Sequence, residues 1–112
     1  MNKNIDRLKI YDLTTIKTHE KFHLIVNEMR ELYIKKNNDY GNSVSDTYNK
    51  FGDVSFAVRI TDKVNRLTTL LENKEQKVQD EKIEDTIIDM VNYGILWLIE
   101  RETDRLENIS KK

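Results

Sequence analysis

Four acidic residues are spaced so that they could act together on a metal ion. Glu28 and Glu31 lie three residues apart, and Asp85 and Asp89 lie four residues apart in a later segment. Side chains at these spacings share one face of an α-helix. Two such pairs facing each other would present hard oxygen ligands, which suit Mg²⁺ or Mn²⁺ bound with water and substrate phosphate. The alternative is that the glutamates are solvated and the aspartates pair with internal cations.

A second group of residues is cationic. Arg59, Lys63 and Arg66 recur at steps of four and three residues, and Lys36 ends an earlier helical segment beside Lys35. Cations beside a metal site would neutralise a polyphosphate, and arginine offers phosphate oxygens a bidentate fork. The alternative is a solvated helix face whose cations pair with nearby acids.

The stretch Asp39-Tyr40-Gly41-Asn42 is a candidate for recognising a base or sugar. Glycine permits a backbone with positive φ at position 41. Tyr40 could then stack on a base, and Asn42 or Asn92 could hydrogen-bond to its edge. The alternative is an ordinary turn in which Tyr40 closes the end of the protein.

The elements that must position these residues are helices. The chain has no proline and only three glycines, which favours helix over turn. Apolar residues at three- and four-residue steps predict helices over 18–36, 53–72 and 80–100, and the charged tail 101–112 is expected to continue the last one before fraying. Asn, Asp, Ser and Gly in 37–52 predict a long loop, in which Ser45 could cap a short helix that ends before Gly52. No strand pattern competes, so the fold class is an all-α bundle.

The segment 80–100 organises the rest of the prediction. Its apolar residues cover most of the helix circumference, which predicts a buried helix that begins at the capping residue Asp80. Asp85, Asp89 and Asn92 nevertheless fall on one narrow stripe. Burying two carboxylates and an amide is costly unless something pairs with them. This stripe is the strongest indication of a functional site.

Composition limits the class of protein. The 112 residues suit one domain, 1–112, in which 1–17 form a short helix or an arm on a neighbouring subunit. The net charge of −1 shows no basic bias toward nucleic acid or membrane. Cysteine is absent, which excludes thiolate metal sites. We see no signal peptide and no membrane-spanning segment, so a cytoplasmic protein is the default expectation. His19 and His23 have no third ligand nearby, and we expect both of them at the surface.

These motifs resemble a known family. The stretches 36–41, 63–67 and 84–93 are similar to the phage and bacterial nucleotide modification associated domain family, type 1. That family is itself similar to the MazG-like all-α nucleoside triphosphate pyrophosphohydrolases. The MazG-like enzymes carry Glu-x-x-Glu on one helix and Glu-x-x-Asp on a later one. Glu28 and Glu31 fit the first motif and Asp89 fits the Asp of the second, but Thr86 stands where the second motif has its Glu.

The resemblance implies a MazG-like bundle that forms homodimers or tetramers with sites near subunit contacts. It implies a nucleotide-handling protein, expected to be phage-encoded. If the chain is an enzyme, Glu28, Glu31, Asp85 and Asp89 would hold Mg²⁺ or Mn²⁺ for cleavage of a nucleoside triphosphate. Lys36, Arg59, Lys63 and Arg66 would bind phosphate, and Asp39, Tyr40 and Asn92 would shape the pocket for base or sugar.

Two other functions stay open. The imperfect acidic motif favours a non-catalytic binder that sequesters a nucleotide, for example a signalling nucleotide of host defence. If no nucleotide binds, the remaining hypothesis is a small helical interaction protein.

Overall fold

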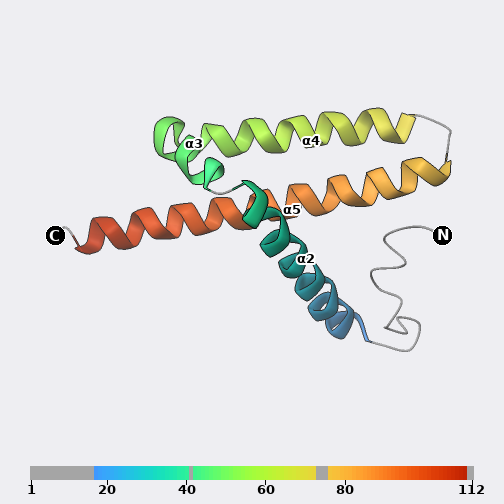
Figure 1. Ribbon diagram of the computed structural model, residues 1–112, viewed down its shortest axis with the longest axis horizontal. Coiled ribbons are helices and arrows are strands. Elements are labelled where there is room, and N and C mark those ends of the chain that lie inside the picture. The colour runs from blue at the N-terminus through green and yellow to red at the C-terminus, as the bar shows by residue number, and fades with distance from the viewer. Residues whose placement is uncertain (1–16, 41, 73–75, 111–112) are drawn as a thin grey trace.

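The computed structural model describes residues 17–40, 42–72 and 76–110, and of 37–40, 76–79 and 110 it describes the backbone. The elements are α2 (Thr18–Tyr40), α3 (Ser43–Phe51), α4 (Val54–Glu72) and α5 (Gln76–Ser110) (Figure 1). No strand occurs in these ranges, so the all-α prediction is confirmed for them. The predicted arm 1–17 falls outside the described residues except for Lys17.

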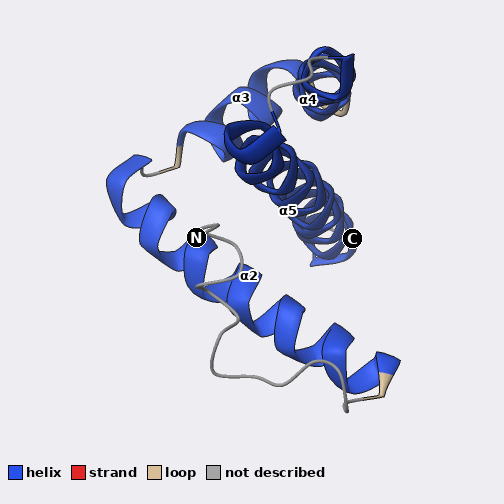
Figure 2. Cartoon of the chain, turned by 90° about the vertical axis from the view of Figure 1, so that its right-hand side faces the viewer, coloured by secondary structure: helices blue, strands red, loops and turns tan. Residues whose placement is uncertain are grey.

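The helices are arranged around α5. α4 runs antiparallel along α5, and α3 connects α4 to α2 at one end (Figure 1). α2 lies on the other side of α5 from α4 and crosses it obliquely (Figure 2). The molecule is elongated, with extents of 53 × 32 × 25 Å, because α5 extends past α3 at its C-terminal end.

The expected long loop at 37–52 is wrong. α2 continues to Tyr40, and the short helix α3 fills Ser43–Phe51. Asn and Asp disfavour a helix interior by only about 0.7 kcal/mol each, which an added backbone hydrogen bond offsets. The expected end before Gly52 is confirmed. Gly52 has φ +71°, and its N–H donates to the Tyr48 carbonyl at 2.7 Å.

The last helix is longer than expected at its start. α5 begins at Gln76, so Asp80 is an interior residue and its predicted capping role is wrong. The expected continuation of the tail is confirmed, since α5 runs unbroken to Ser110. Within the described ranges, no helix combines the length and apolar character needed to cross a membrane.

The buried core is small and lies where α3, α4 and α5 meet. The Phe56 ring is fully buried. Its centroid lies 5.7 Å from that of Tyr48 and 5.9 Å from that of Trp97, with the Phe56 and Trp97 rings nearly parallel. Met29 of α2 is also buried. The three rings join α3, α4 and α5 by burying apolar area and by their mutual geometry.

Polar contacts close the same junction at its edge. Trp97 Nε1 and an Arg101 guanidinium nitrogen donate to the two carboxylate oxygens of Asp53, at 2.7 and 2.6 Å. The hydrogen bond from Trp97, and then that from Arg101, lowers the pKa of Asp53. Tyr48 donates its hydroxyl to Asp104 at 2.9 Å, which together with burial raises the pKa of Tyr48. The turn between α3 and α4 is thereby fixed to α5.

The expectation that α5 is buried all round is wrong for a single chain. On one side of α5, Thr86 is almost fully buried and donates its hydroxyl to the Lys82 carbonyl at 2.6 Å. Ile87, Val91 and Leu98 lie on another side and are exposed by 45%, 44% and 69%. Among the described residues, the helices that pack on α5 leave this side of it exposed.

Candidate functional site

A cavity of about 400 Å³ lies where all four described helices converge. α2 contributes Tyr33 and Lys36, and α4 contributes Lys63. The start of α3 lines the cavity with residues 42–45, and α5 lines it with Asp89, Asn92, Tyr93, Leu96, Ile99 and Glu100. Its volume falls in the range of small-molecule sites, about 300–1,000 Å³.

One carboxylate on the cavity wall binds two lysines. Lys36 Nζ donates to Asp89 Oδ1 at 3.1 Å, and Lys63 Nζ lies 3.3 Å from Asp89 Oδ2. The three residues come from three helices, so the cluster depends on the tertiary fold. The side chains of Asp89 and Lys63 are each 27% exposed, whereas Lys36 is 53% exposed. With two ammonium groups and one carboxylate, the cluster carries one excess positive charge at neutral pH.

The first turn of α3 lies at the same cavity. Asn42 stands at the N-cap, where the Asp46 N–H donates to its carbonyl at 3.0 Å, and its side chain makes no capping hydrogen bond. The first N–H groups of a helix have no intrahelical acceptor and carry a partial positive charge. The start of α3 therefore adds to the positive potential that the two lysines create.

The walls of the cavity other than Lys36, Lys63 and Asp89 combine apolar and polar side chains. Leu96 and Ile99 supply apolar surface, and Ser45 Oγ is hydrogen-bonded to the carboxylate of Glu100. Tyr93 also lines the cavity, and the Arg59 guanidinium carbon lies 5.7 Å from its ring centroid. This distance is typical of a cation–π contact. Arg59 therefore supports a wall residue through its ring, and does not itself line the cavity.

The four predicted metal ligands are not brought together within one chain. Asp89 is held by lysines, and Glu31 pairs with its neighbour Arg30 at 3.3 Å while 63% exposed. Glu28 is half-buried on α2, and Asp85 is exposed one turn before Asp89. Among the residues that the structure describes, no three acidic or histidine side chains are placed to hold a metal ion. The single chain therefore does not fit the predicted Mg²⁺ or Mn²⁺ site.

The predicted nucleotide-binding residues divide into three groups. Lys36, Lys63 and Asn92 line the cavity. Arg59 and Arg66 of α4 do not line it, and Arg66 is exposed. Asp39 and Tyr40 end α2, but their side chains lie outside the described part, as does Gly41.

Thr86 stands where the MazG-like motif would place its Glu, and it is almost fully buried and does not line the cavity. It is therefore a structural residue. The prediction that His19 and His23 lie at the surface is confirmed, since both are exposed.

Sequence reasoning missed Ser45 as a wall residue, and it missed Tyr33 and Glu100. A signal for Glu100 was present, because Asp89, Asn92, Leu96 and Glu100 recur at steps of three and four residues. Extending the polar stripe by two turns would have reached Glu100. Ser45 had no such signal, because its place depends on how α3 folds back toward α5.

Comparison with known proteins identifies the family. A family described as nucleotide modification associated domain 1 matches residues 36–100, which is more than half of the chain. The chain belongs to this family. No curated protein and no solved structure matches it. The matched range includes all cavity residues except Tyr33.

Proposed function

We propose that this member of the nucleotide modification associated domain 1 family binds a nucleotide in the cavity between α2, α3, α4 and α5. The observation that carries the proposal is the pair of lysines that share Asp89 at the cavity wall. A phosphate group beside Lys36 and Lys63 would gain charge-assisted hydrogen bonds, which are the stronger class. On binding, the ammonium groups of Lys36 and Lys63 would exchange their contacts with the Asp89 carboxylate for contacts with phosphate oxygens.

The other walls of the cavity match the remaining parts of a nucleotide. The start of α3 offers N–H groups to a second phosphate, as helix N-termini do for anions. Leu96, Ile99 and the Tyr93 ring offer apolar contact for a base. Glu100 and Asn92 offer polar groups to a sugar hydroxyl or a base edge. The family description, which refers to nucleotide modification, agrees with this ligand class.

A MazG-like pyrophosphohydrolase is the finer hypothesis, and the contacts within one chain support it less well. Such an enzyme needs several carboxylates around a metal ion, and the predicted four do not converge within one chain. A second copy would have to supply the missing ligands. The metal site therefore stays a prediction, and we assign no catalytic step to it.

The test is a binding panel on the whole chain. Thermal unfolding and calorimetry are run with ribo- and deoxyribonucleoside mono-, di- and triphosphates, with unphosphorylated nucleosides as controls. We expect di- and triphosphates to raise Tm and the nucleosides to have no effect. Binding should weaken as salt is raised, because screening reduces attraction between lysine and phosphate.

The same panel separates the alternatives. Binding that survives EDTA without release of pyrophosphate supports a non-catalytic binder. Binding that needs Mg²⁺ and releases pyrophosphate supports the hydrolase. If no nucleotide shifts Tm, the proposal is wrong and a small helical interaction protein is the better account.

A further inference from the structure

Glu100 brings a carboxylate into a cavity whose lysines suit an anion. It lines the cavity from the same helix as Asp89, about 16 Å further along the axis at 1.5 Å per residue. Lys36 and Lys63 both contact Asp89, so the lysines and Glu100 lie toward opposite ends of the α5 wall. A nucleotide whose phosphates lie beside the lysines therefore directs another of its parts toward Glu100. The reverse orientation would place phosphate beside a carboxylate, which repels it.

The order of side chains along this wall indicates which part of the nucleotide reaches Glu100. From the lysine end, Asn92 comes first, Leu96 and Ile99 follow, and Glu100 comes last. A nucleotide has the order phosphate, sugar and base. The aliphatic side chains suit the flat face of a base, and the few polar groups of such a site fix the orientation of the ligand. Asn92 then lies beside the sugar, and Glu100 meets the edge of the base.

The Glu100 carboxylate is held in position by α3. Ser45 Oγ donates a hydrogen bond to Glu100 Oε1, and both residues are half-buried. An ionised carboxylate has about four acceptor positions, and the serine hydroxyl uses one of them. Because the side chain is already ordered by this bond, a ligand that binds to it has less conformational entropy to remove.

The chemistry of a carboxylate distinguishes one base from another. An ionised carboxylate accepts hydrogen bonds and donates none. Guanine presents two adjacent donors, N1–H and the N2 amino group, which match the two oxygens of one carboxylate. Adenine and cytosine each present an amino group beside a ring nitrogen that is an acceptor, and uracil presents one N–H between two carbonyl acceptors. Because these acceptors repel carboxylate oxygens, guanine fits Glu100 best.

We propose that Glu100 makes the cavity selective for guanine nucleotides by accepting hydrogen bonds from N1–H and the N2 amino group of the base. Ser45 is the positioning residue, since it acts on the base through Glu100. This inference rests on the proposed nucleotide binding and adds the class of base to it. A purely structural role of Glu100, as a link between α3 and α5, would affect all nucleotides alike, so the ratio of affinities is the informative measurement.

The first experiment compares bases on the native chain. Calorimetry in EDTA measures Kd for GTP, inosine triphosphate, ATP and UTP. We expect GTP to bind at least about tenfold more tightly than UTP, because uracil leaves the carboxylate poorly paired. Inosine triphosphate keeps N1–H but lacks the N2 amino group, so its Kd should lie between these two. Equal Kd values for the four nucleotides overturn the selectivity and leave nucleotide binding intact, whereas absence of binding by all four overturns the proposed function as well.

The second experiment replaces the carboxylate at constant size. Glu100→Gln substitutes an amide donor for one acceptor oxygen, so we expect Kd for GTP to rise about tenfold and Kd for UTP to change by less than about threefold. Glu102→Gln is the matched control, because Glu102 is exposed on α5 and does not line the cavity, and it should keep the native ratio. A Glu100→Gln variant that keeps the native ratio, or that loses affinity for GTP and UTP by the same factor, overturns the proposal.

The role of Ser45 is tested in the same assay. Ser45→Ala removes the positioning hydrogen bond but keeps the carboxylate, so the preference for GTP over UTP should fall about threefold. Ser45→Thr keeps the hydroxyl and is expected to retain the native preference. An unchanged preference in Ser45→Ala overturns the positioning role.

Discussion

Lys63 Nζ on α4 lies 3.3 Å from Asp89 Oδ2 on α5, and the same carboxylate accepts a hydrogen bond from Lys36 on α2. One aspartate therefore joins three helices at the wall of the cavity. In sequence these residues are far apart, and each alone resembles an ordinary surface charge. Their convergence is what makes phosphate binding the best-supported function.

Replacing Asp89 separates its possible roles. Asp89→Asn removes the counter-charge of two lysines that stay in contact with solvent, so we expect a loss of about 1 kcal/mol in the free energy of unfolding. Nucleotide binding in EDTA should tighten several-fold, because the carboxylate no longer repels phosphate or competes for the lysines. Calorimetry in EDTA and in Mg²⁺ checks this. If Asp89→Asn abolishes nucleotide binding only in Mg²⁺, Asp89 is a metal ligand and the result supports the pyrophosphohydrolase hypothesis.

Phe56 is the residue on which the junction of α3, α4 and α5 depends most. Phe56→Ala would leave a cavity between Tyr48 and Trp97, and we expect it to cost about 3–5 kcal/mol. Phe51→Ala is the matched control, because Phe51 is 65% exposed, and a surface change costs about 0.5 kcal/mol or less. Urea unfolding measures both. Equal losses in the two variants would show that the aromatic junction is not the core.

The pH dependence of stability should reflect Asp53. Its pKa is lowered below 3.8 in the folded chain by its bonds to Trp97 and Arg101. Asp53 therefore binds a proton more readily in the unfolded chain. Its contribution to the free energy of unfolding is present above about pH 3.8 and is lost as pH falls through the pKa that Asp53 has in the folded chain.

Asp53→Asn should flatten the acid side of the profile, with a lower Tm at pH 6 and a smaller further drop between pH 5 and 3. Thermal melts across this range compare the variant with the native chain and with Asp46→Asn, which changes an exposed aspartate on α3. An unchanged acid slope in Asp53→Asn would contradict the assignment.

Much of the fold follows from periodicity. The steps of three and four residues in 53–72 predicted α4 to within one residue of its start, and the tail was correctly expected to extend α5. The loop at 37–52 was wrong because local composition was judged without the tertiary packing that holds α3. Tyr48, which local pattern did not single out, is buried against Phe56 and anchors that helix.

The site was predictable where its residues share one helix. Asp89 and Asn92 were found because a polar stripe on an apolar segment is visible in the sequence. Lys63 was predicted as a member of the cationic row on α4. The other two members of that row do not line the cavity: Arg59 stacks on Tyr93 and Arg66 is exposed. Which member of a row reaches a site depends on how two helices cross, and periodicity does not contain that information.

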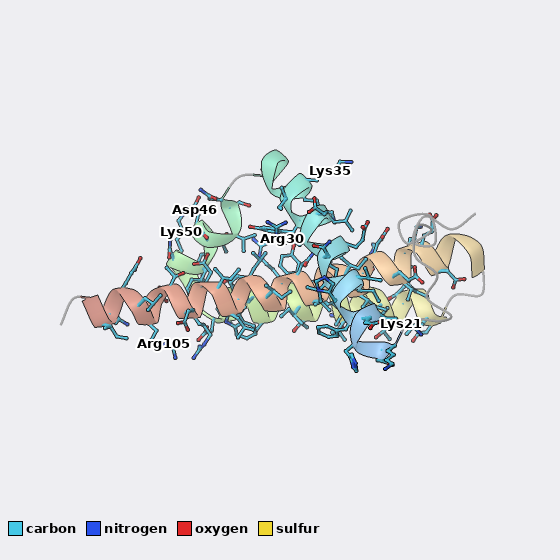
Figure 3. The ribbon with its side chains drawn as sticks, turned by 90° about the horizontal axis from the view of Figure 1, so that it is seen from below. Lys21, Arg30, Lys35, Asp46, Lys50 and Arg105 are labelled. Carbon is cyan, nitrogen blue, oxygen red and sulfur yellow. The ribbon has the colours of Figure 1, made fainter. Side chains whose placement is uncertain are left out.

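The most direct test of phosphate binding compares three lysine variants in nucleoside triphosphate affinity. Lys63→Gln and Lys36→Gln each remove one charge-assisted contact of about 1.5–3 kcal/mol, so we expect Kd to rise about tenfold or more in each. Lys35→Gln is the matched control, since Lys35 is exposed on α2 beside Lys36 but does not line the cavity (Figure 3). The account predicts near-native Kd for Lys35→Gln and weakened binding for the other two. Equal affinity in all three variants, measured on folded protein, would contradict it.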